Sequence, residues 1–339
     1  MKQLDLGNVI TAMVTPFKAD AVQSVDTDAA VQLANYLLNH GTDTILLTGS
    51  TGEDAQLEPQ EKWDIVKAVR QNTPPNTPIM VSTGDTNTGR AIAKAQQAFA
   101  VGADAILVSV PEYIKPTQDA MHIHFAAIAK AIYPQPMMIY NIPGRTGSEI
   151  LPETVMSLAY RNENIIGIKQ SCANLDRVSQ MRGHRYCNTW RSDFQIYSGD
   201  DGLTLPMLAL GAKGVVSVAA HLQGNLIQDM IREFKRGHVN IARQIHLGLS
   251  PLFEALFMET NPLPVKEALY QKGMIASRRL RTLGEMTNGH KRALADILNI
   301  FEKPKRISHT PTSNDEFLNR QVHKLYLLQR ALQRERQKA

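Results

Sequence analysis

A chain of 339 residues is long enough for one large domain with an appendage, and its 43% hydrophobic and 20% charged residues are typical of an ordered globular protein. The sequence has no run of about 18 apolar residues and no apolar secretory signal at its N-terminus, which argues against a membrane span and predicts a cytoplasmic protein. The net charge of +5 lies in residues 301–339, which hold nine Lys/Arg and four Asp/Glu, so nucleic-acid binding by the remaining chain is not indicated.

Eight short apolar runs alternate with amphipathic segments over residues 1–236. This order predicts parallel strands joined by crossover helices, because parallel neighbours need a long return connection. Eight units fit an α/β fold of the (β/α)8 TIM-barrel type. A doubly wound open sheet is the alternative, but no Gly-x-Gly-x-x-Gly turn opens any unit. The predicted strands are 9–16, 44–48, 79–83, 105–110, 137–142, 165–169, 196–198 and 214–218, and helices are expected at 28–39, 60–71, 90–100, 120–132, 152–161, 203–209 and 226–235.

Two further regions follow the predicted barrel. Residues 237–302 are expected to form a C-terminal helical region, with helices at 240–258, 264–272 and 290–301. Residues 303–339 read as a Pro/Ser/Thr-rich linker followed by one basic amphipathic helix. Docking of this tail helix on the body or on a sister subunit is favoured over an RNA- or membrane-binding arm.

Lys169 ends the apolar run 165–169, and an ammonium at the end of a buried strand is either paired or used chemically. Burial lowers the pKa of a lysine, which leaves free amine near neutral pH to form a Schiff base with a ketone. The preceding strand ends at Tyr140 and is followed by Arg145. A phenol, a guanidinium and an amine are therefore expected at the carboxyl ends of consecutive strands, where barrel enzymes have their active sites.

The turn after the second strand places Ser50 and Thr51 between two glycines. Such a turn lets the backbone approach a small anion while the hydroxyls donate to a carboxylate or relay a proton, although the same composition also makes an ordinary tight loop. A phosphate loop is not favoured, because no Gly-Lys-Ser/Thr follows. Tyr113 follows the fourth strand, and Asp200-Asp201 follows the seventh as a helix N-cap or solvated turn.

Five segments carry a resemblance to a known family: 49–53, 140–147, 167–169, 198–201 and 261–266. Over residues 7–300, and in the same order, the chain resembles the pyruvate-dependent class I aldolases, which include dihydrodipicolinate synthases and N-acetylneuraminate lyases. Arg145 indicates the synthase branch, because a guanidinium binds a planar carboxylate through two hydrogen bonds and the lyases lack it.

The resemblance implies a mechanism in which Lys169 forms an iminium with pyruvate. Tyr140, Ser50 and Tyr113 would then relay protons as the catalytic hydroxyls. The resulting enamine would attack L-aspartate 4-semialdehyde, giving 4-hydroxy-tetrahydrodipicolinate in the diaminopimelate route to lysine. No metal or organic cofactor is expected, and His122-x-His124 is not favoured as a metal site because its segment is predicted to be helical.

Substrate binding and assembly are also implied by the resemblance. Thr51 and the backbone at Val216 match the site of the pyruvate carboxylate, and Arg145 matches the site of the semialdehyde carboxylate. The family usually assembles as a dimer of dimers, so a homotetramer is expected in which Tyr113 reaches the site of a neighbouring subunit. Two alternatives stay open: a related aldolase or lyase for a sugar acid or hydroxy-oxoglutarate, and a barrel scaffold whose basic tail binds RNA or a protein.

Several positions depart from the family pattern. Ser50 stands where synthases usually have threonine, and Gln170 stands where glutamate is common. Members inhibited by L-lysine bind it at positions that match Asp54, Lys62, Thr86, Arg90 and Glu112 of this chain. Two of these residues are cations here, and a cation repels the ammonium groups of lysine. The sequence therefore predicts weak or absent inhibition by lysine.

Overall fold

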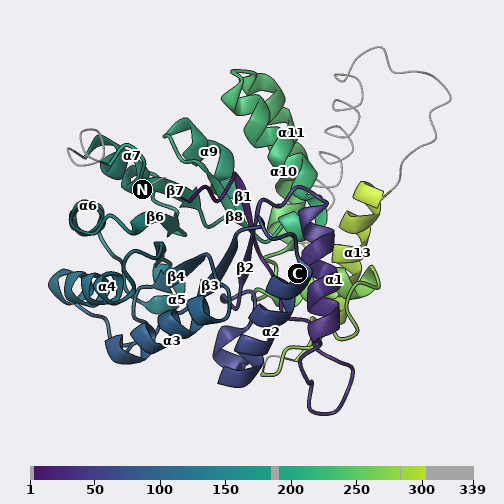
Figure 1. Ribbon diagram of the computed structural model, residues 1–339. Coiled ribbons are helices and arrows are strands. Elements are labelled where there is room, and N and C mark those ends of the chain that lie inside the picture. Colours follow the sequence, from purple (N-terminus) through teal and green to yellow (C-terminus); the bar gives the residue numbers. More distant parts are fainter. Residues whose placement is uncertain (1–3, 185–190, 283, 303–339) are drawn as a thin grey trace.

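The computed structural model describes residues 4–184, 191–282 and 284–302 (Figure 1). Eight parallel strands form a closed barrel in chain order, which confirms the predicted (β/α)8 class. The tail 303–339 lies outside the described residues. The strands are β1 (Val9–Ala12), β2 (Thr44–Leu47), β3 (Ile79–Ser82), β4 (Ala105–Ser109), β5 (Met137–Asn141), β6 (Ile165–Gln170), β7 (Gln195–Ser198) and β8 (Gly214–Ser217).

Helices connect the strands and cover the outside of the barrel (Figure 1). Several begin where a polar side chain accepts from a free backbone N–H, as Asp26, Asn87 and Thr117 do. The connecting helices are α1 (Thr27–Leu38), η1 (Asp54–Gln56), α2 (Pro59–Asn72), α3 (Thr88–Ala100), α4 (Gln118–Ile132), α5 (Pro143–Thr146), α6 (Pro152–Arg161), α7 (Asp176–Gly183), η2 (Asp201–Leu203), α9 (Thr204–Ala209) and α10 (Ala220–Lys235).

The sequence predicted the alternation but missed some bounds. Strand 9–16 is shorter than predicted, since β1 ends at Ala12. Helix α7 was not predicted, because only Val178 and Met181 are buried on it and its apolar stripe is narrow. Helix α10 starts at Ala220 rather than at residue 226, and the non-helical backbone of Gln223 interrupts its first turns.

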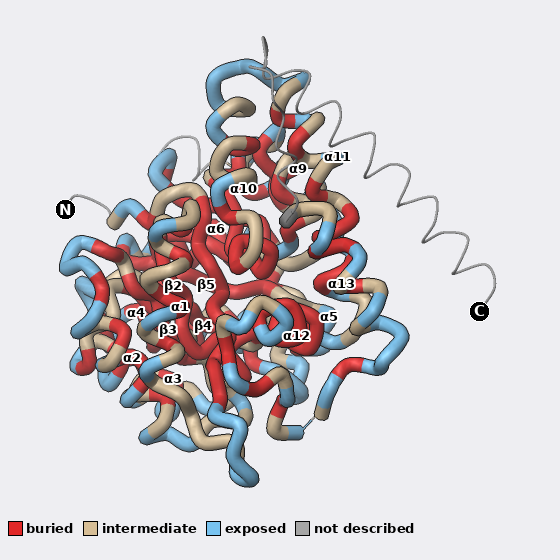
Figure 2. Tube along the Cα trace, turned by 90° about the vertical axis from the view of Figure 1, so that its right-hand side faces the viewer, coloured by how far each residue is buried: buried red, intermediate tan, exposed pale blue. Residues whose placement is uncertain are grey.

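Two apolar layers build the core, and buried residues follow the strands and the helix faces turned toward them (Figure 2). The outer layer lies between the barrel and its helices and includes Val81, Ile139 and Val215. The inner layer fills the barrel with alternate strand residues. Its buried members are Leu6, Ile10, Ala12, Leu46, Met80, Ala105, Leu107, Met138, Tyr140, Ile166, Tyr197 and Val216.

Three C-terminal helices pack against one side of the barrel: α11 (Val239–Ala255), α12 (Leu263–Gln271) and α13 (Asn288–Glu302). Helix α11 packs on α10, and α13 contacts both α11 and α12. Residues 263–269 of α12 are all buried (Figure 2). The segment before α12 contacts α5 through a hydrogen bond from the Arg145 guanidinium to the backbone oxygen of Asn261. Within the described residues, no helix has the length and apolar character needed to cross a membrane.

Candidate active site

Lys169 lies in β6, in register between Tyr140 of β5 and Tyr197 of β7. Both tyrosines belong to the inner layer, so the lysine also faces the interior of the barrel. Lys169 is 5% exposed, and its Nζ lies 4.2 Å from the centroid of the Tyr140 ring. Among the described residues, no carboxylate forms a salt bridge with it. The amine is therefore buried beside a phenol and is not used in an ion pair.

Gly199 leaves the space that the Lys169 side chain needs. A Cβ atom at this position would lie 3.1 Å from Cε of Lys169 and 1.8 Å from Oγ of Ser171. Any larger residue at this position would displace one of these two side chains. Gly199, which lies in the segment 198–201 that carries the resemblance, therefore leaves room for the side chain that bears the amine.

The turn that carries Ser50 and Thr51 is flanked by strained backbone. Thr48 has φ 52° and Glu53 has φ 58°, in the left-handed region that a β-branched residue such as Thr48 rarely adopts. Strain of this kind costs about 1–3 kcal/mol per residue and is concentrated at functional sites. Thr51 is 3% exposed, whereas Ser50 is half-buried. The fold therefore imposes an unfavourable backbone where the relay hydroxyls are predicted.

Asn261 joins this turn to the loop after β5. Its Nδ2 donates to Oγ1 of Thr51 at 2.9 Å, and its backbone oxygen accepts from the Arg145 guanidinium at 3.1 Å. Because the Thr51 hydroxyl accepts this hydrogen bond, its own proton is free to donate elsewhere. Among the described residues Arg145 forms no salt bridge, so a surface ion pair does not explain its presence. Asn261 lies in the segment 261–266, which carries the resemblance, but the sequence alone predicted no role for it.

Val216 lies in β8, is 1% exposed and belongs to the inner layer. Two buried ionisable groups hold the chain just after it. Asp201 accepts from Ser217 Oγ and from the backbone N–H groups of Val218 and Ala219. Burial raises the pKa of Asp201 to about 6, although these hydrogen bonds lower it. The helix N-cap interpretation is confirmed for Asp200, which caps η2. The solvated-turn interpretation is wrong for Asp201, because this residue is buried.

His221 links the same segment to the end of the first strand. Its Nε2 accepts from the backbone N–H of Val14 at 3.1 Å, and its Nδ1 lies 2.8 Å from the carbonyl oxygen of Val218. This arrangement requires a neutral imidazole with the proton on Nδ1. Burial lowers the pKa of His221 to about 4, which favours that neutral form.

Tyr113, another predicted catalytic residue, lies at the surface of the chain. It has φ 67° and is 90% exposed, and its backbone N–H donates to Thr146. The fold of one chain therefore does not bring Tyr113 to Lys169 as it brings Tyr140. The next residue, Ile114, is also exposed, at 57%.

Several buried polar atoms around the carboxyl ends of the strands have no hydrogen-bond partner within the described residues. Such atoms are uncommon in folded proteins and call for an explanation. Sequence reasoning missed them, although three of these residues directly follow an apolar strand. These atoms include Oγ1 of Thr48, Oγ1 of Thr83, Oγ of Ser171 and Oδ1 of Asn261.

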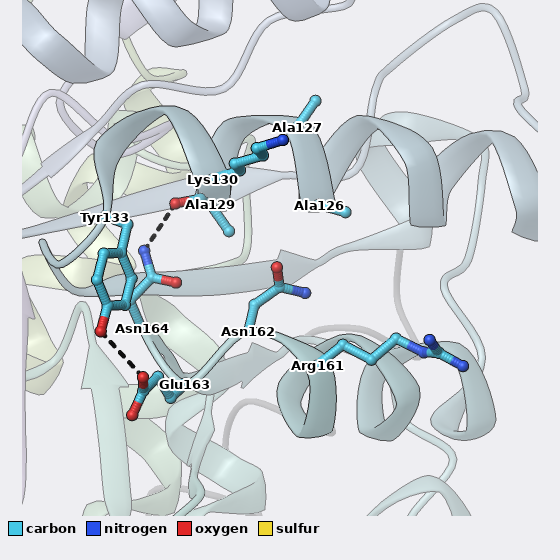
Figure 3. A pocket seen from close by; sticks show the side chains of 9 residues that line it. All are labelled: Ala126, Ala127, Ala129, Lys130, Tyr133, Arg161, Asn162, Glu163 and Asn164. Carbon is cyan, nitrogen blue, oxygen red and sulfur yellow. Dashed lines mark hydrogen bonds between the residues drawn. The ribbon is translucent and has the colours of Figure 1, made fainter.

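Two cavities lie away from this site. One, of about 500 Å³, lies between α4 and α6 near the amino ends of β5 and β6, and Figure 3 shows its lining. The other, of about 600 Å³, is lined by all five positions that the resemblance matches to the lysine site of inhibited family members: Asp54, Lys62, Thr86, Arg90 and Glu112. Among the described residues, no cluster of His, Cys, Asp and Glu could hold a metal ion, and His124 lies in α4 beside Thr88.

Comparison with known proteins identifies the family. The model of the dihydrodipicolinate synthetase family matches residues 5–301. The chain belongs to the dihydrodipicolinate synthetase family. It is 47% identical over 269 residues to the 4-hydroxy-tetrahydrodipicolinate synthase of Nostoc punctiforme, which covers 79% of this chain and 89% of that protein. It is 43% identical over 293 residues to the synthase of the same name from Prochlorococcus marinus, covering 86% and 95%.

Solved structures of the family agree with the fold. A dihydrodipicolinate synthase from Cyanidioschyzon merolae, crystallised with lysine bound, superposes with a TM-score of 0.83 at 39% identity, covering 87% of this chain and 97% of that one. The dihydrodipicolinate synthase of Aquifex aeolicus superposes with a TM-score of 0.82 at 37% identity, covering 89% and 100%. The barrel and its C-terminal helices are therefore the fold of this family.

Proposed function

We propose that the chain condenses pyruvate with L-aspartate 4-semialdehyde to give 4-hydroxy-tetrahydrodipicolinate, in the diaminopimelate route to lysine. The observation that carries the proposal is the amine of Lys169, buried in the barrel 4.2 Å from the Tyr140 ring and without a carboxylate partner among the described residues. Membership of the dihydrodipicolinate synthetase family supports the same reaction. The protein is therefore a carbon–carbon lyase of the class I aldolase type.

In the first half of the reaction, the amine of Lys169 attacks the ketone carbon of pyruvate. Loss of water gives an iminium, whose positive charge makes the adjacent methyl group acidic. Thr51 is suited to hold the pyruvate carboxylate, because its hydroxyl proton is free. The backbone at Val216, a residue of the inner layer, is proposed to bind the same carboxylate. The ring of Tyr140 lies 4.2 Å from the amine, which supports a role for its hydroxyl in moving protons to and from the imine.

In the second half, the methyl carbon loses a proton and the enamine attacks the aldehyde of the semialdehyde substrate. Arg145, which is held by the carbonyl of Asn261 and forms no salt bridge among the described residues, is suited to bind the carboxylate of this substrate. The amino group of the substrate then attacks the iminium carbon, which closes the ring and releases Lys169. Ser50 and Tyr113 complete the proton relay in this proposal.

Reductive trapping tests this function directly. Borohydride added with pyruvate reduces the iminium to a stable amine, and peptide mass mapping locates it. We expect the adduct on Lys169, while the buried Lys62 and Lys266 serve as internal controls and stay unmodified. The variant Lys169→Ala is expected to lose both the adduct and turnover. An adduct on another lysine, or turnover by Lys169→Ala, would contradict the proposal.

The assembly that we propose is a homotetramer formed as a dimer of dimers, in which Tyr113 enters the site of a neighbouring subunit. Its 90% exposure in the single chain supports a position at an interface. Mixing two inactive variants tests this arrangement. Tyr113→Phe and Lys169→Ala subunits, unfolded and refolded together, should regain activity, because a hybrid dimer contains one complete site. If the tyrosine acted within its own subunit, no hybrid would be active.

A further inference from the structure

Glu53 and Lys266 form a buried ion pair that the proposed reaction does not use. Their side chains are 1% and 0% exposed, and Lys266 Nζ lies 2.7 Å from Glu53 Oε1. Glu53 ends the turn that carries Ser50 and Thr51, whereas Lys266 comes from α12 in the C-terminal region. The pair therefore connects the turn that carries Ser50 and Thr51, called the relay turn below, to a helix outside the barrel.

This ion pair is costly. Burial raises the pKa of Glu53 and lowers the pKa of Lys266, which in each case is opposite to the effect of the partner's charge. Oε2 of Glu53 is also buried without a hydrogen-bond partner in the described residues. Replacing such a pair with apolar residues of similar volume is often neutral or stabilising. Stability alone therefore does not explain why the chain keeps two charges here.

The surroundings hold Lys266 in one place. Its Nζ lies 4.1 Å from the centroid of the Phe17 ring, and the guanidinium of Arg281 covers the same ring at 4.7 Å. Arg281 is fixed in turn by two hydrogen bonds to Glu61, at 2.7 and 2.6 Å. An ammonium held this firmly sets the position of the carboxylate that it binds.

The Glu53 carboxylate lies at the end of the turn whose hydroxyls must be positioned for the proposed reaction. Glu53 has a left-handed backbone at φ 58°, and Thr48 at the other end of the turn has φ 52°. Turns of this kind persist only when surrounding contacts impose them. Asn261, five residues before Lys266, holds the same turn through Thr51. Asn261 and Lys266, which are five residues apart, thus bind the turn at two points. Asn261 binds Thr51, and Lys266 binds Glu53 at the strained end of the turn.

We propose that the Glu53–Lys266 pair is a positioning device that keeps Ser50 and Thr51 in register with the Schiff-base lysine, so that the C-terminal region completes the active site. This inference rests on the proposed function of the site. Neither residue touches substrate, so the prediction concerns the placement of hydroxyls and not a new chemical step.

A charge-removal series separates positioning from stability. Glu53→Gln keeps the shape and a weaker hydrogen bond, and Glu53→Gln/Lys266→Met removes both charges at similar volume. We expect the double variant to melt within a few degrees of the wild type, or higher, yet to lose at least tenfold in kcat/KM for pyruvate. Glu53→Gln alone should lose about threefold. Lys291→Met breaks an ion pair with Glu285 at 2.8 Å and serves as the control with unchanged kinetics.

Two readouts decide the outcome. The rate of borohydride-trapped adduct formation should fall in the same order as kcat/KM while the melting temperatures do not. Activity that simply follows melting temperature across the series, or a stable double variant with wild-type kinetics, would overturn the inference. If the double variant does not fold, the Glu53→Gln variant decides by the same comparison. Failure of the proposed function is distinguishable, because the wild type itself would then form no pyruvate adduct on Lys169.

Discussion

The two ends of the barrel differ in how their polar side chains are satisfied. At the amino end, the cavity between α4 and α6 is lined by the exposed Lys130 and Arg161 and by the buried Asn164, whose side-chain amide already has partners. Asn164 donates to the carbonyl oxygen of Ala129 at 2.9 Å, and Tyr133 donates to Glu163 at 3.0 Å (Figure 3). Asn164 also donates to the carbonyl oxygen of Gln135 at 3.0 Å. The buried polar groups at the amino end therefore serve to stabilise the fold.

At the carboxyl end the pattern is reversed. The amine of Lys169 has no carboxylate partner among the described residues, and the same is true of the Arg145 guanidinium. Buried hydroxyls such as those of Thr48 and Thr83 lack hydrogen bonds within the described residues. Each unsatisfied buried group costs about 1–3 kcal/mol, so a concentration of them at one end indicates a site arranged for a ligand. Cavity size alone would not have identified it.

The largest effect is expected from Tyr140→Phe. Loss of a positioned proton-transfer hydroxyl should lower kcat roughly 100- to 1000-fold, with a small change in KM for pyruvate. Tyr197→Phe is the matched control, because Tyr197 flanks Lys169 on the other strand but donates its hydroxyl to the carbonyl of Gly7 at 2.7 Å. That control should keep kcat and lose about 1 kcal/mol of stability. Steady-state kinetics and denaturant unfolding would test both, and equal losses of kcat would remove the distinction.

Arg145→Ala should raise KM for the semialdehyde on the order of 10- to 100-fold, because a hydrogen bond to a charged group contributes roughly 1.5–3 kcal/mol. KM for pyruvate should change little, since Thr51 and Val216 are proposed to hold that substrate. Arg161→Ala, at the amino-end cavity, is the matched control and should leave both constants unchanged. A similar rise of both KM values would show that Arg145 does not discriminate between the substrates.

Asp201 and His221 should give opposite pH dependences of stability. The folded pKa of Asp201 is raised to about 6, so its contribution is present at low pH and is lost as the pH rises from about 4 to about 6. The folded pKa of His221 is lowered to about 4, so its contribution is present above about pH 6.5 and is lost as the pH falls toward 4. In the wild type these effects partly cancel.

Two single variants should separate the contributions of Asp201 and His221 to the pH dependence of stability. Asp201→Asn leaves His221, so the free energy of unfolding should rise more steeply than in the wild type between pH 4 and 6.5. His221→Gln leaves Asp201, so the free energy of unfolding of this variant should fall over the same pH range. Two pKa units correspond to about 3 kcal/mol, which is the upper size of either change. Urea unfolding at several pH values would measure it, and parallel profiles for all three proteins would disprove it.

Inhibition by L-lysine is expected to be weak or absent. In the cavity lined by the matching positions, Lys62 is buried and paired with Asp54, and Asp85 is paired with Arg90 at 2.8 Å and Lys94 at 2.9 Å. Asp54 and Asp85, two of the three carboxylates that line this cavity, are thus already paired with cations of the chain, which reduces the attraction for an added ammonium. Half-inhibition of the purified enzyme by submillimolar lysine would contradict this. Arg90→Glu should restore some sensitivity.

Much of the fold could be predicted from sequence, because apolar runs and amphipathic segments alternate regularly from residue 9 onward. The short helices escaped prediction for a physical reason. Helix α5 is a single turn that begins at Pro143, and α7 buries few residues, so neither has enough periodicity to be recognised. For the site, Lys169 and Tyr140 stood out because polar groups at the ends of buried strands are rare.

By itself, the sequence determined the order of the strands, the family and the residue types available for a Schiff-base reaction, because these follow from local periodicity and from motifs a few residues long. Only the tertiary structure decided which groups meet. Asn261 reaches Thr51 across 210 residues, and Lys266 reaches Glu53 across 213. Contacts this distant leave no periodic signal, and the left-handed backbone at Thr48 exists only because the surrounding packing imposes it.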